Sequence, residues 1–193
     1  MQAIMISIQP QWFKKILNGE KTIEIRKTMP KCELPCKVYI YCTKGKSDKD
    51  SLVVSHSLPA IMPYNANGKV VAEFTLNKIK EYGYVYSPAT LMQGYYSRRG
   101  KELDYSKTCL KLHEIEKYAN DGQMLPKPIY AWHIDDLVVY DKPKKLSEFY
   151  SLKKCDSCKK SGYESAACRY DEDCKIPIQI TRPPQSWCYV EGI

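Results

Sequence analysis

The stretch GEKTIEIRK, from Gly19 to Lys27, alternates like a β-strand and is unusually rich in charge. Residues two apart on a strand share a face, so Thr22, Glu24 and Arg26 are expected on one side. The other side is expected to carry Lys21, Ile23, Ile25 and Lys27. The alternation predicts a carboxylate beside a guanidinium on one face, with an ammonium at the turn that leads in.

Segments on both sides of this stretch have the periodicity of further strands and helices. Alternating or continuous apolar runs predict strands at residues 3–10, 36–44, 68–82, 128–141 and 176–190, the fourth being a strand pair or one bent strand. Helices are predicted at residues 10–20, 87–96 and 111–120, the second with Ser87 as its cap and Pro88 in its first turn. Several strands with few helices between them predict an α+β fold with a curled mixed sheet.

The composition favours a polyanionic partner without proving one. The net charge is +8, from 30 Lys and Arg against 22 Asp and Glu. Such an excess attracts nucleic acid above all, through counterion release. It also serves solubility, so charge alone leaves both interpretations open. Tyr is abundant, with 16 residues against 3 Phe, and its amphipathic ring suits wet binding surfaces as well as cores.

The apolar runs of the chain predict a cytoplasmic protein that does not enter a membrane. Residues 1–12 have no basic leader, and their apolar run is too short for a signal peptide. No segment approaches the roughly 20 apolar residues of a spanning helix. In a reducing compartment the nine cysteines are expected to be thiols or metal ligands rather than disulfides.

The spacing Gly-x-Lys-x-x-Glu-x-Arg in residues 19–26, placed after a strand and a first helix, resembles the signature of the ASCH domain, a relative of the PUA fold. Three further stretches are similar to the family in order and context: SIQPQWFKKIL, KVVAEFTL and PIYAWHIDDLVVYDKPKKLSEF. The ending RPPQSWCYV is similar to the tail of phage-type and bacterial ASCH proteins. The resemblance covers about residues 1–150 and 177–193.

This resemblance implies a small mixed β-barrel flanked by helices, with a cleft beside the first helix that the signature lines. The chain then has three parts: an ASCH/PUA-like barrel at residues 1–150, a cysteine-rich knuckle at 151–176, and a terminal strand at 177–193 that returns to the barrel. The family is generally regarded as binding RNA or nucleotides. A nucleic acid or nucleotide is therefore the expected partner, with RNA favoured.

Certain members of the family are amidohydrolases that act on acetylated cytidine through a catalytic Lys, Thr and Glu. By the resemblance, Lys21 matches the Lys and Glu73, in VVAEF, matches the Glu. Glu24 stands where those enzymes have Thr, so a carboxylate replaces a hydroxyl. These three residues are the candidate catalytic set of a hydrolase that acts on a modified nucleoside, or of a ribonuclease.

The same residues also suit binding without catalysis. Glu24 and Arg26 either close the barrel as an ion pair or read a ligand, with Glu24 accepting from a base amino group and Arg26 holding a phosphate or base edge. Lys21 is a phosphate contact if it is solvated, and a base or nucleophile if it is desolvated. Ser7 and Tyr41 are further candidates to line the cleft.

Four cysteines near the C-terminus form a separate motif. The candidate metal ligands are Cys155, Cys158, Cys168 and Cys174. CDSC presents two thiolates to one ion, and the second pair, although more widely spaced, completes a tetrahedron. The segment has almost no apolar residues, so a metal would order it. We predict a closed structural zinc site, with free thiols or a redox pair as the alternatives.

Three functions are consistent with the sequence. The first is a binding module for a nucleotide or an exposed base, which the replacement of Thr by Glu24 favours. The second is the hydrolase that uses Lys21 and Glu73. The third is a protein-interaction module that docks through the zinc segment.

The zinc prediction is tested by elemental analysis of the purified protein. We expect about one zinc per chain, and loss of that zinc when Cys155 and Cys158 are both replaced by Ser, because a tetrahedral site needs all four thiolates. A Cys109→Ser variant is the control and should keep the metal. Metal-free wild-type protein would contradict the prediction.

Overall fold

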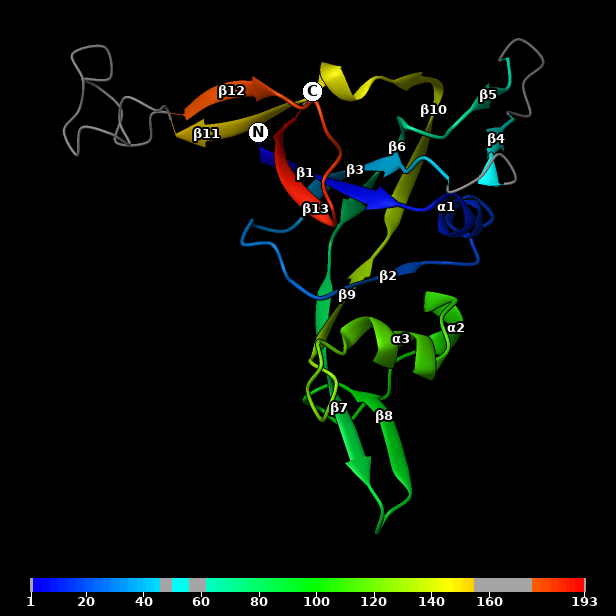
Figure 1. The fold of residues 1–193 in the computed structure, drawn as a ribbon, viewed down its shortest axis with the longest axis vertical. Coiled ribbons are helices and arrows are strands. Elements are labelled where there is room, and N and C mark those ends of the chain that lie inside the picture. The colour runs from blue at the N-terminus through cyan, green and yellow to red at the C-terminus, as the bar shows by residue number, and fades with distance from the viewer. Residues whose placement is uncertain (1, 46–49, 56–61, 155–174, 193) are drawn as a thin grey trace, which may run out of the picture.

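The computed structural model describes residues 2–45, 50–55, 62–154 and 175–192, and shows an α+β fold (Figure 1). The helices are α1 (Pro10–Leu17), α2 (Tyr105–Thr108) and α3 (Leu112–Ala119), with a 3-10 turn at Leu146–Glu148. The first strands are β1 (Gln2–Ile8), β2 (Ile23–Arg26), β3 (Cys36–Cys42), β4 (Val53–Val54), β5 (Tyr64–Asn65) and β6 (Lys69–Leu76). They are followed by β7 (Ile79–Ser87), β8 (Met92–Tyr96), β9 (Ile129–His133), β10 (Asp135–Lys144), β11 (Tyr150–Lys154), β12 (Lys175–Gln179) and β13 (Trp187–Glu191).

A five-stranded mixed sheet forms the upper part of the molecule, with strand order β10-β6-β3-β1-β13. Strand β1 runs parallel to β3 and antiparallel to β13, so the last described strand pairs with the first. The two strands at the ends of this order have no partner on their outer side within the described residues. The sheet is therefore open, and the expected small barrel is not closed.

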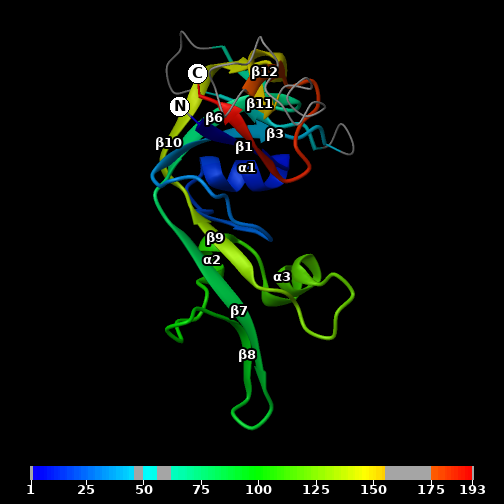
Figure 2. The ribbon, with the colours of Figure 1, turned by 90° about the vertical axis from the view of Figure 1, so that its left-hand side faces the viewer.

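A long bent ribbon joins this sheet to the lower part of the molecule (Figures 1 and 2). Strand β6 leads into β7 and β9 leads into β10, and the two continuous segments pair antiparallel along both halves. Strand β2 joins the lower sheet by pairing with β9, and β8 joins it by pairing with β7. The run at residues 128–141 is thus two consecutive strands, β9 and β10, which continue from one sheet into the other and do not pair with each other.

The core lies on both faces of the upper sheet and under the lower one. On one face α1 places Phe13 and Ile16 against the isoleucines of β1 and the side chain of Trp132. Tyr39 and Phe149 pack on the opposite face, with their ring centroids 4.9 Å apart. A third cluster lies between the lower sheet and helix α3. The first helix is therefore fixed between the upper sheet and strand β2, as Figure 2 shows.

The helix predicted at residues 87–96 is wrong. Strand β7 continues to Ser87 and β8 begins at Met92, with Gly83 pairing with Tyr96 and Ser87 with Met92. Leu91 takes a positive φ of 55° to close the turn. The Ser-Pro pair is a local cap signal, whereas the tyrosines around it alternate as strand residues do, and the strand pairing prevails.

Candidate functional site

The signature stretch begins where α1 ends. Gly19 has a φ of 73°, which a residue without Cβ adopts freely, and the backbone amides of Glu20 and Lys21 donate to the carbonyl of Lys15. The chain then enters β2, in which Glu24 lies opposite Trp132 of β9. Because the chain turns tightly after α1, strand β2 lies directly below this helix.

Lys21 is buried, with only 2% of its surface exposed. Its ammonium donates to the carbonyl of Ile23 at 2.9 Å and to that of Thr108 at 2.7 Å, and lies 3.2 Å from Oε2 of Glu24. These three contacts engage all three donors of an ammonium group. The ring of Trp12 lies over it, 5.7 Å away at its centroid. Lys21 is thus held as a fully paired cation.

Arg26 completes a triad of charged groups. Its guanidinium lies 3.0 Å from Oε1 of Glu24 and donates to the carbonyls of Ser7 at 2.9 Å and Ser186 at 3.1 Å. The Nε–H of Arg26 is buried and has no hydrogen-bond partner among the described residues. Each oxygen of Glu24 therefore faces one cation.

The triad carries more positive than negative charge. Two buried cations share one carboxylate, and removing ions from water is costly unless each one is paired and hydrogen-bonded. Glu24 keeps 12% exposure of its side chain, and an ionised carboxylate has about four lone-pair sites for acceptance. The site is consequently able to attract an anion and still accept a hydrogen bond.

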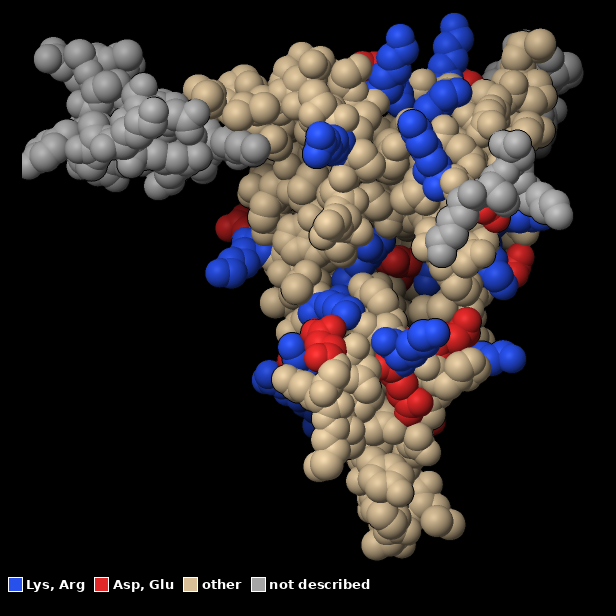
Figure 3. All heavy atoms as spheres, viewed as in Figure 1, with Lys and Arg blue, Asp and Glu red and all other residues tan. Residues whose placement is uncertain are grey.

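A cavity of about 780 Å³ lies against the triad. Figure 3 shows a recess in the middle of this face, with basic and acidic side chains at its walls. The cavity takes residues from β1, α1, β2, α3 and the segment before β13. The lining includes Ser7, Trp12, Lys21, Glu24, Arg26, Thr28, Glu114, Tyr118, Gln185 and Ser186. Its size is within the roughly 300–1,000 Å³ of small-molecule sites.

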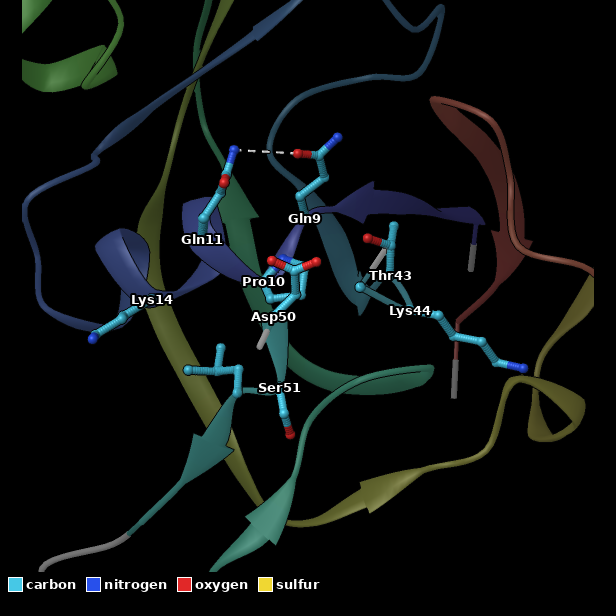
Figure 4. A pocket seen from close by; sticks show the side chains of 10 residues that line it. Gln9, Pro10, Gln11, Lys14, Thr43, Lys44, Asp50 and Ser51 are labelled. Atoms are coloured by element: carbon cyan, nitrogen blue, oxygen red, sulfur yellow. Dashed lines mark hydrogen bonds between the residues drawn. The ribbon is translucent and has the colours of Figure 1, made fainter. Parts of the chain in front are cut away.

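A second cavity, of about 460 Å³, lies at the start of α1 and shares Gln9 and Thr43 with the first (Figure 4). Figure 4 shows Lys14 and Lys44 on opposite sides of it, with their ammonium groups directed away from its centre, where Asp50 lies. The charged groups of this second cavity do not converge, so the first cavity is the better candidate for a binding site.

The structure brings Lys21, Glu24 and Arg26 together, but the strand face predicted for Lys21 is wrong. Glu24 and Arg26 share a face, while Ile23 and Ile25 are buried on the other, as alternation predicts. Lys21 was expected opposite Glu24 but lies beside it. Strand β2 begins only at Ile23, so strand alternation does not apply to Lys21.

Ser7 lies at the cavity, where its carbonyl accepts from Arg26 and its hydroxyl donates to the carbonyl of Pro184 at 2.6 Å. Tyr41 is buried on the opposite face of the upper sheet, in the cluster that contains Tyr39 and Phe149. It therefore does not line either cavity described above.

The structure does not bring Glu73 to Lys21. Glu73 pairs across the strands with Tyr39, so it lies on the face opposite α1. Its carboxylate accepts from Tyr140 at 2.6 Å and from Lys37 at 2.8 Å. Burial alone would raise the pKa of Glu73, but these hydrogen bonds outweigh burial and lower it. Glu73 is an ionised, paired carboxylate outside the cavity, because the apolar side of β6 fills the face towards α1.

Sequence reasoning missed several residues that line the cavity. Trp12, on α1, packs against the core while its ring covers Lys21. Tyr118 lies on the exposed side of α3, and Gln185 and Ser186 precede the last strand. No local signal marks them, because they meet the triad only through the tertiary fold.

The candidate zinc ligands Cys155, Cys158, Cys168 and Cys174 lie outside the described residues. Within the described part of the chain no cluster of three or more His, Cys, Asp and Glu residues is arranged to hold a metal. Cys32 and Cys36 lie with their Sγ atoms 3.3 Å apart. Burial, and then the neighbouring Cys32, raise the pKa of Cys36 to about 12, so that thiol stays protonated.

Comparisons with known proteins agree with this architecture. Residues 6–119 match the ASCH domain family. The structure of an ASCH protein from Zymomonas mobilis is similar, with 16% identity, a TM-score of 0.50, and coverage of 98% of this chain and 87% of that one. Two variants of the same bacterial protein match at 18% and 16% identity with TM-scores of 0.48 and 0.49, covering 98% of this chain and 90% and 88% of theirs. No curated protein matches the sequence significantly.

The match to the ASCH domain family identifies this α+β fold as PUA-like. Since the family match covers more than half of the chain, the protein belongs to the ASCH domain family. Domains of this family are in general associated with nucleic acids. None of the helices in the described residues is long and apolar enough to cross a membrane.

The triad predicts a large difference between two neighbouring lysines. Lys21→Met should lower the free energy of unfolding by about 3–5 kcal/mol, because it removes one partner of a buried ion pair and frees two buried carbonyls. Lys27→Met is the control: Lys27 is exposed and pairs with Asp121, so its loss should cost below about 1 kcal/mol. Denaturant unfolding measures both, and equal losses would contradict the central role of Lys21.

Proposed function

We propose that the cavity beside the triad binds a nucleotide unit of single-stranded RNA. The observation that carries the proposal is the buried triad of two cations and one carboxylate in the wall of a cavity of suitable size. A phosphate balances the excess positive charge, which is felt strongly because the triad is shielded from water. Glu24 is available to accept from an exocyclic amine or a ribose hydroxyl.

Two aromatic rings support this choice of ligand. Trp12 and Tyr118 come from α1 and α3, and both line the cavity. Bases stack on such rings in most single-strand binding sites, with a contribution of about 1–3 kcal/mol per base. A purely anionic ligand would not need them, so a nucleotide explains both the charge and the aromatic content.

The contacts of Lys21 favour binding over nucleophilic catalysis. Its three donors are already engaged, and Glu73 lies on the other face of the sheet. Lys21 instead orients Glu24, which Arg26 holds from the other side. The preorganised carboxylate then reads the ligand with little loss of conformational entropy.

Binding is tested by fluorescence anisotropy with labelled single-stranded RNA and DNA of one sequence at several salt concentrations. Arg26→Gln should weaken RNA binding by about 1–3 kcal/mol and reduce the salt slope by about one, because one cation near the phosphate is lost. Arg182→Gln removes an exposed arginine that does not line the cavity and should change the salt slope less.

Tyr118→Ala tests the aromatic contact while all three residues of the triad stay in place. Tyr118 is 37% exposed and Tyr150, on β11, is 38% exposed, so Tyr150→Ala is a matched control. We expect a loss of about 1–3 kcal/mol for Tyr118→Ala only. Unchanged RNA affinity in both Tyr118→Ala and Arg26→Gln at low salt would overturn the proposal, and equal affinity for DNA would remove the preference for RNA.

The alternative function, a hydrolase that uses Lys21 and Glu73, is tested by a separate measurement. Wild-type protein is incubated with acetylated cytidine and with labelled RNA, and the products are separated by chromatography. We expect no turnover, because the ammonium of Lys21 has no free donor and lies apart from Glu73. Turnover that Lys21→Met abolishes in folded protein would show that catalysis takes place at the triad.

A further inference from the structure

The hairpin of β7 and β8 has an unusual composition. Residues 82–97 contain no charged side chain, although 27% of the whole chain is charged, and five of these residues are tyrosines. The hairpin projects from the lower end of the molecule in Figures 1 and 2. In Figure 3 this end shows neither basic nor acidic residues. With five residue pairs at about 3.3 Å per residue, it extends roughly 15 Å from the lower sheet.

Large apolar side chains lie exposed at the hairpin tip. Leu91 is 91% exposed, and Tyr86 and Met92 beside it are exposed as well. Ser87 of the β7 end pairs with Met92 and Tyr86 pairs with Gln93, so Tyr86 and Met92 flank Leu91 on opposite faces of the hairpin tip. Single exposed apolar residues are ordinary on protein surfaces, whereas a group of them at a projecting tip marks a contact surface.

The base of the same hairpin is basic. Between Lys78 and Lys107 the chain has six Lys and Arg and three Asp and Glu, all outside residues 82–97. Two of the acidic residues are paired, Glu81 with Arg98 at 3.2 Å and Asp104 with Lys107 at 3.7 Å. The remaining cations are Lys78, Lys80, Arg99 and Lys101. None of these four forms an ion pair within the described residues, and we refer to them as the basal cluster.

The charges of the basal cluster act on one another. The charge of Lys78, then partial burial and the charge of Lys101, lower the pKa of Lys80. Burial, and then the charges of Lys78 and Lys80, lower the pKa of His133, whose backbone amide donates to the carbonyl of Lys78. Unpaired cations held close together favour a ligand with several negative charges.

We propose that the β7–β8 hairpin is a second nucleic-acid contact, in which the basal cluster holds phosphates and the tip of Tyr86, Leu91 and Met92 inserts beside an unstacked base. This hairpin surface is distinct from the cavity, because no residue of the hairpin or of the basal cluster lines the cavity. The occupant is a structured nucleic acid with a helix end or a loop, where a base is free to leave the stack. The proposal goes beyond the cavity, since it needs neither Arg26 nor Glu24.

The apolar tip and the basic base of the hairpin together favour a nucleic acid as the partner. Apolar wedges of Leu, Met and similar residues insert between base steps in proteins that bend or open a duplex, and nearby Lys and Arg bind the backbone. The tip lacks charge and therefore loses little solvation when it enters a base stack. A protein partner would account for the apolar tip but leave the unpaired cations at its base unexplained.

The tip is tested with an RNA hairpin and a DNA hairpin that each carry 2-aminopurine at the loop-closing pair. Its fluorescence rises when the base unstacks. Wild-type protein should raise the fluorescence, and Leu91→Asn should abolish the rise. Asn accepts the positive φ of this turn, so the fold is kept. Met124→Asn is the matched control, because Met124 is 96% exposed outside the hairpin, and it should behave as wild type.

The basal cluster is tested by the salt dependence of hairpin binding. The double variant Lys80→Gln, Lys101→Gln should reduce the salt slope by about two, while Lys142→Gln, Lys145→Gln should not. The variants of the tip and the basal cluster are also assayed with the short single-stranded RNA that tests the cavity, and there they should bind as wild type does. Loss of binding by Arg26→Gln alone therefore bears on the cavity, and loss by the hairpin variants alone bears on the hairpin.

Two outcomes would overturn the proposal. The first is a fluorescence rise in Leu91→Asn equal to that of wild type, which would show that the tip does not reach the base. The second is a wild-type dimer that Leu91→Asn converts to a monomer in sedimentation analysis, which would show that the tip joins two copies of the chain. Differences between the RNA and DNA hairpins would identify the nucleic acid without affecting the assignment.

Discussion

The burial of the Lys21 ammonium is the constraint on which the triad, and with it the charged wall of the cavity, depends. A cation this deep requires a carboxylate and carbonyl oxygens around it, and Glu24, Ile23 and Thr108 supply them. Glu24 in turn needs the second cation, which also binds carbonyls of β1 and of the segment before β13. Three charged side chains thus tie β1, β2, α2 and the C-terminal segment together.

This arrangement makes the structural and the functional interpretations of the signature compatible. An ion pair that only closed the fold would be neutral, whereas two cations and one carboxylate leave an excess of charge at the cavity wall. The same hydrogen bonds occupy all three donors of the Lys21 ammonium, so none is left to donate to a ligand. A site of fixed charge with aromatic rings around it is suited to recognition, because little has to be ordered when the ligand arrives.

The sequence predicts local features well and long-range placement poorly. Alternation over Ile23–Arg26 correctly separates the apolar face from the charged one, and apolar spacing finds helix α3. It fails for Lys21, where the strand has not begun, and for the residues after Ser87, where cross-strand pairing overrides a helix cap. The position of Glu73 depends on which face of β6 meets α1, and the alternation of a strand with apolar residues on both faces does not decide that.

Helix α3 connects the two candidate binding surfaces physically. On one side it contributes Glu114 and Tyr118 to the cavity. On the other, Glu116 accepts from the hydroxyl of Tyr84 at 2.6 Å, which fixes β7 against the helix. Because Tyr84 also packs edge-on against Tyr95 at 5.4 Å, the base of the hairpin is held against α3. The position of the hairpin base relative to the cavity is therefore set by the fold, so a nucleic acid that contacts both surfaces must match that spacing.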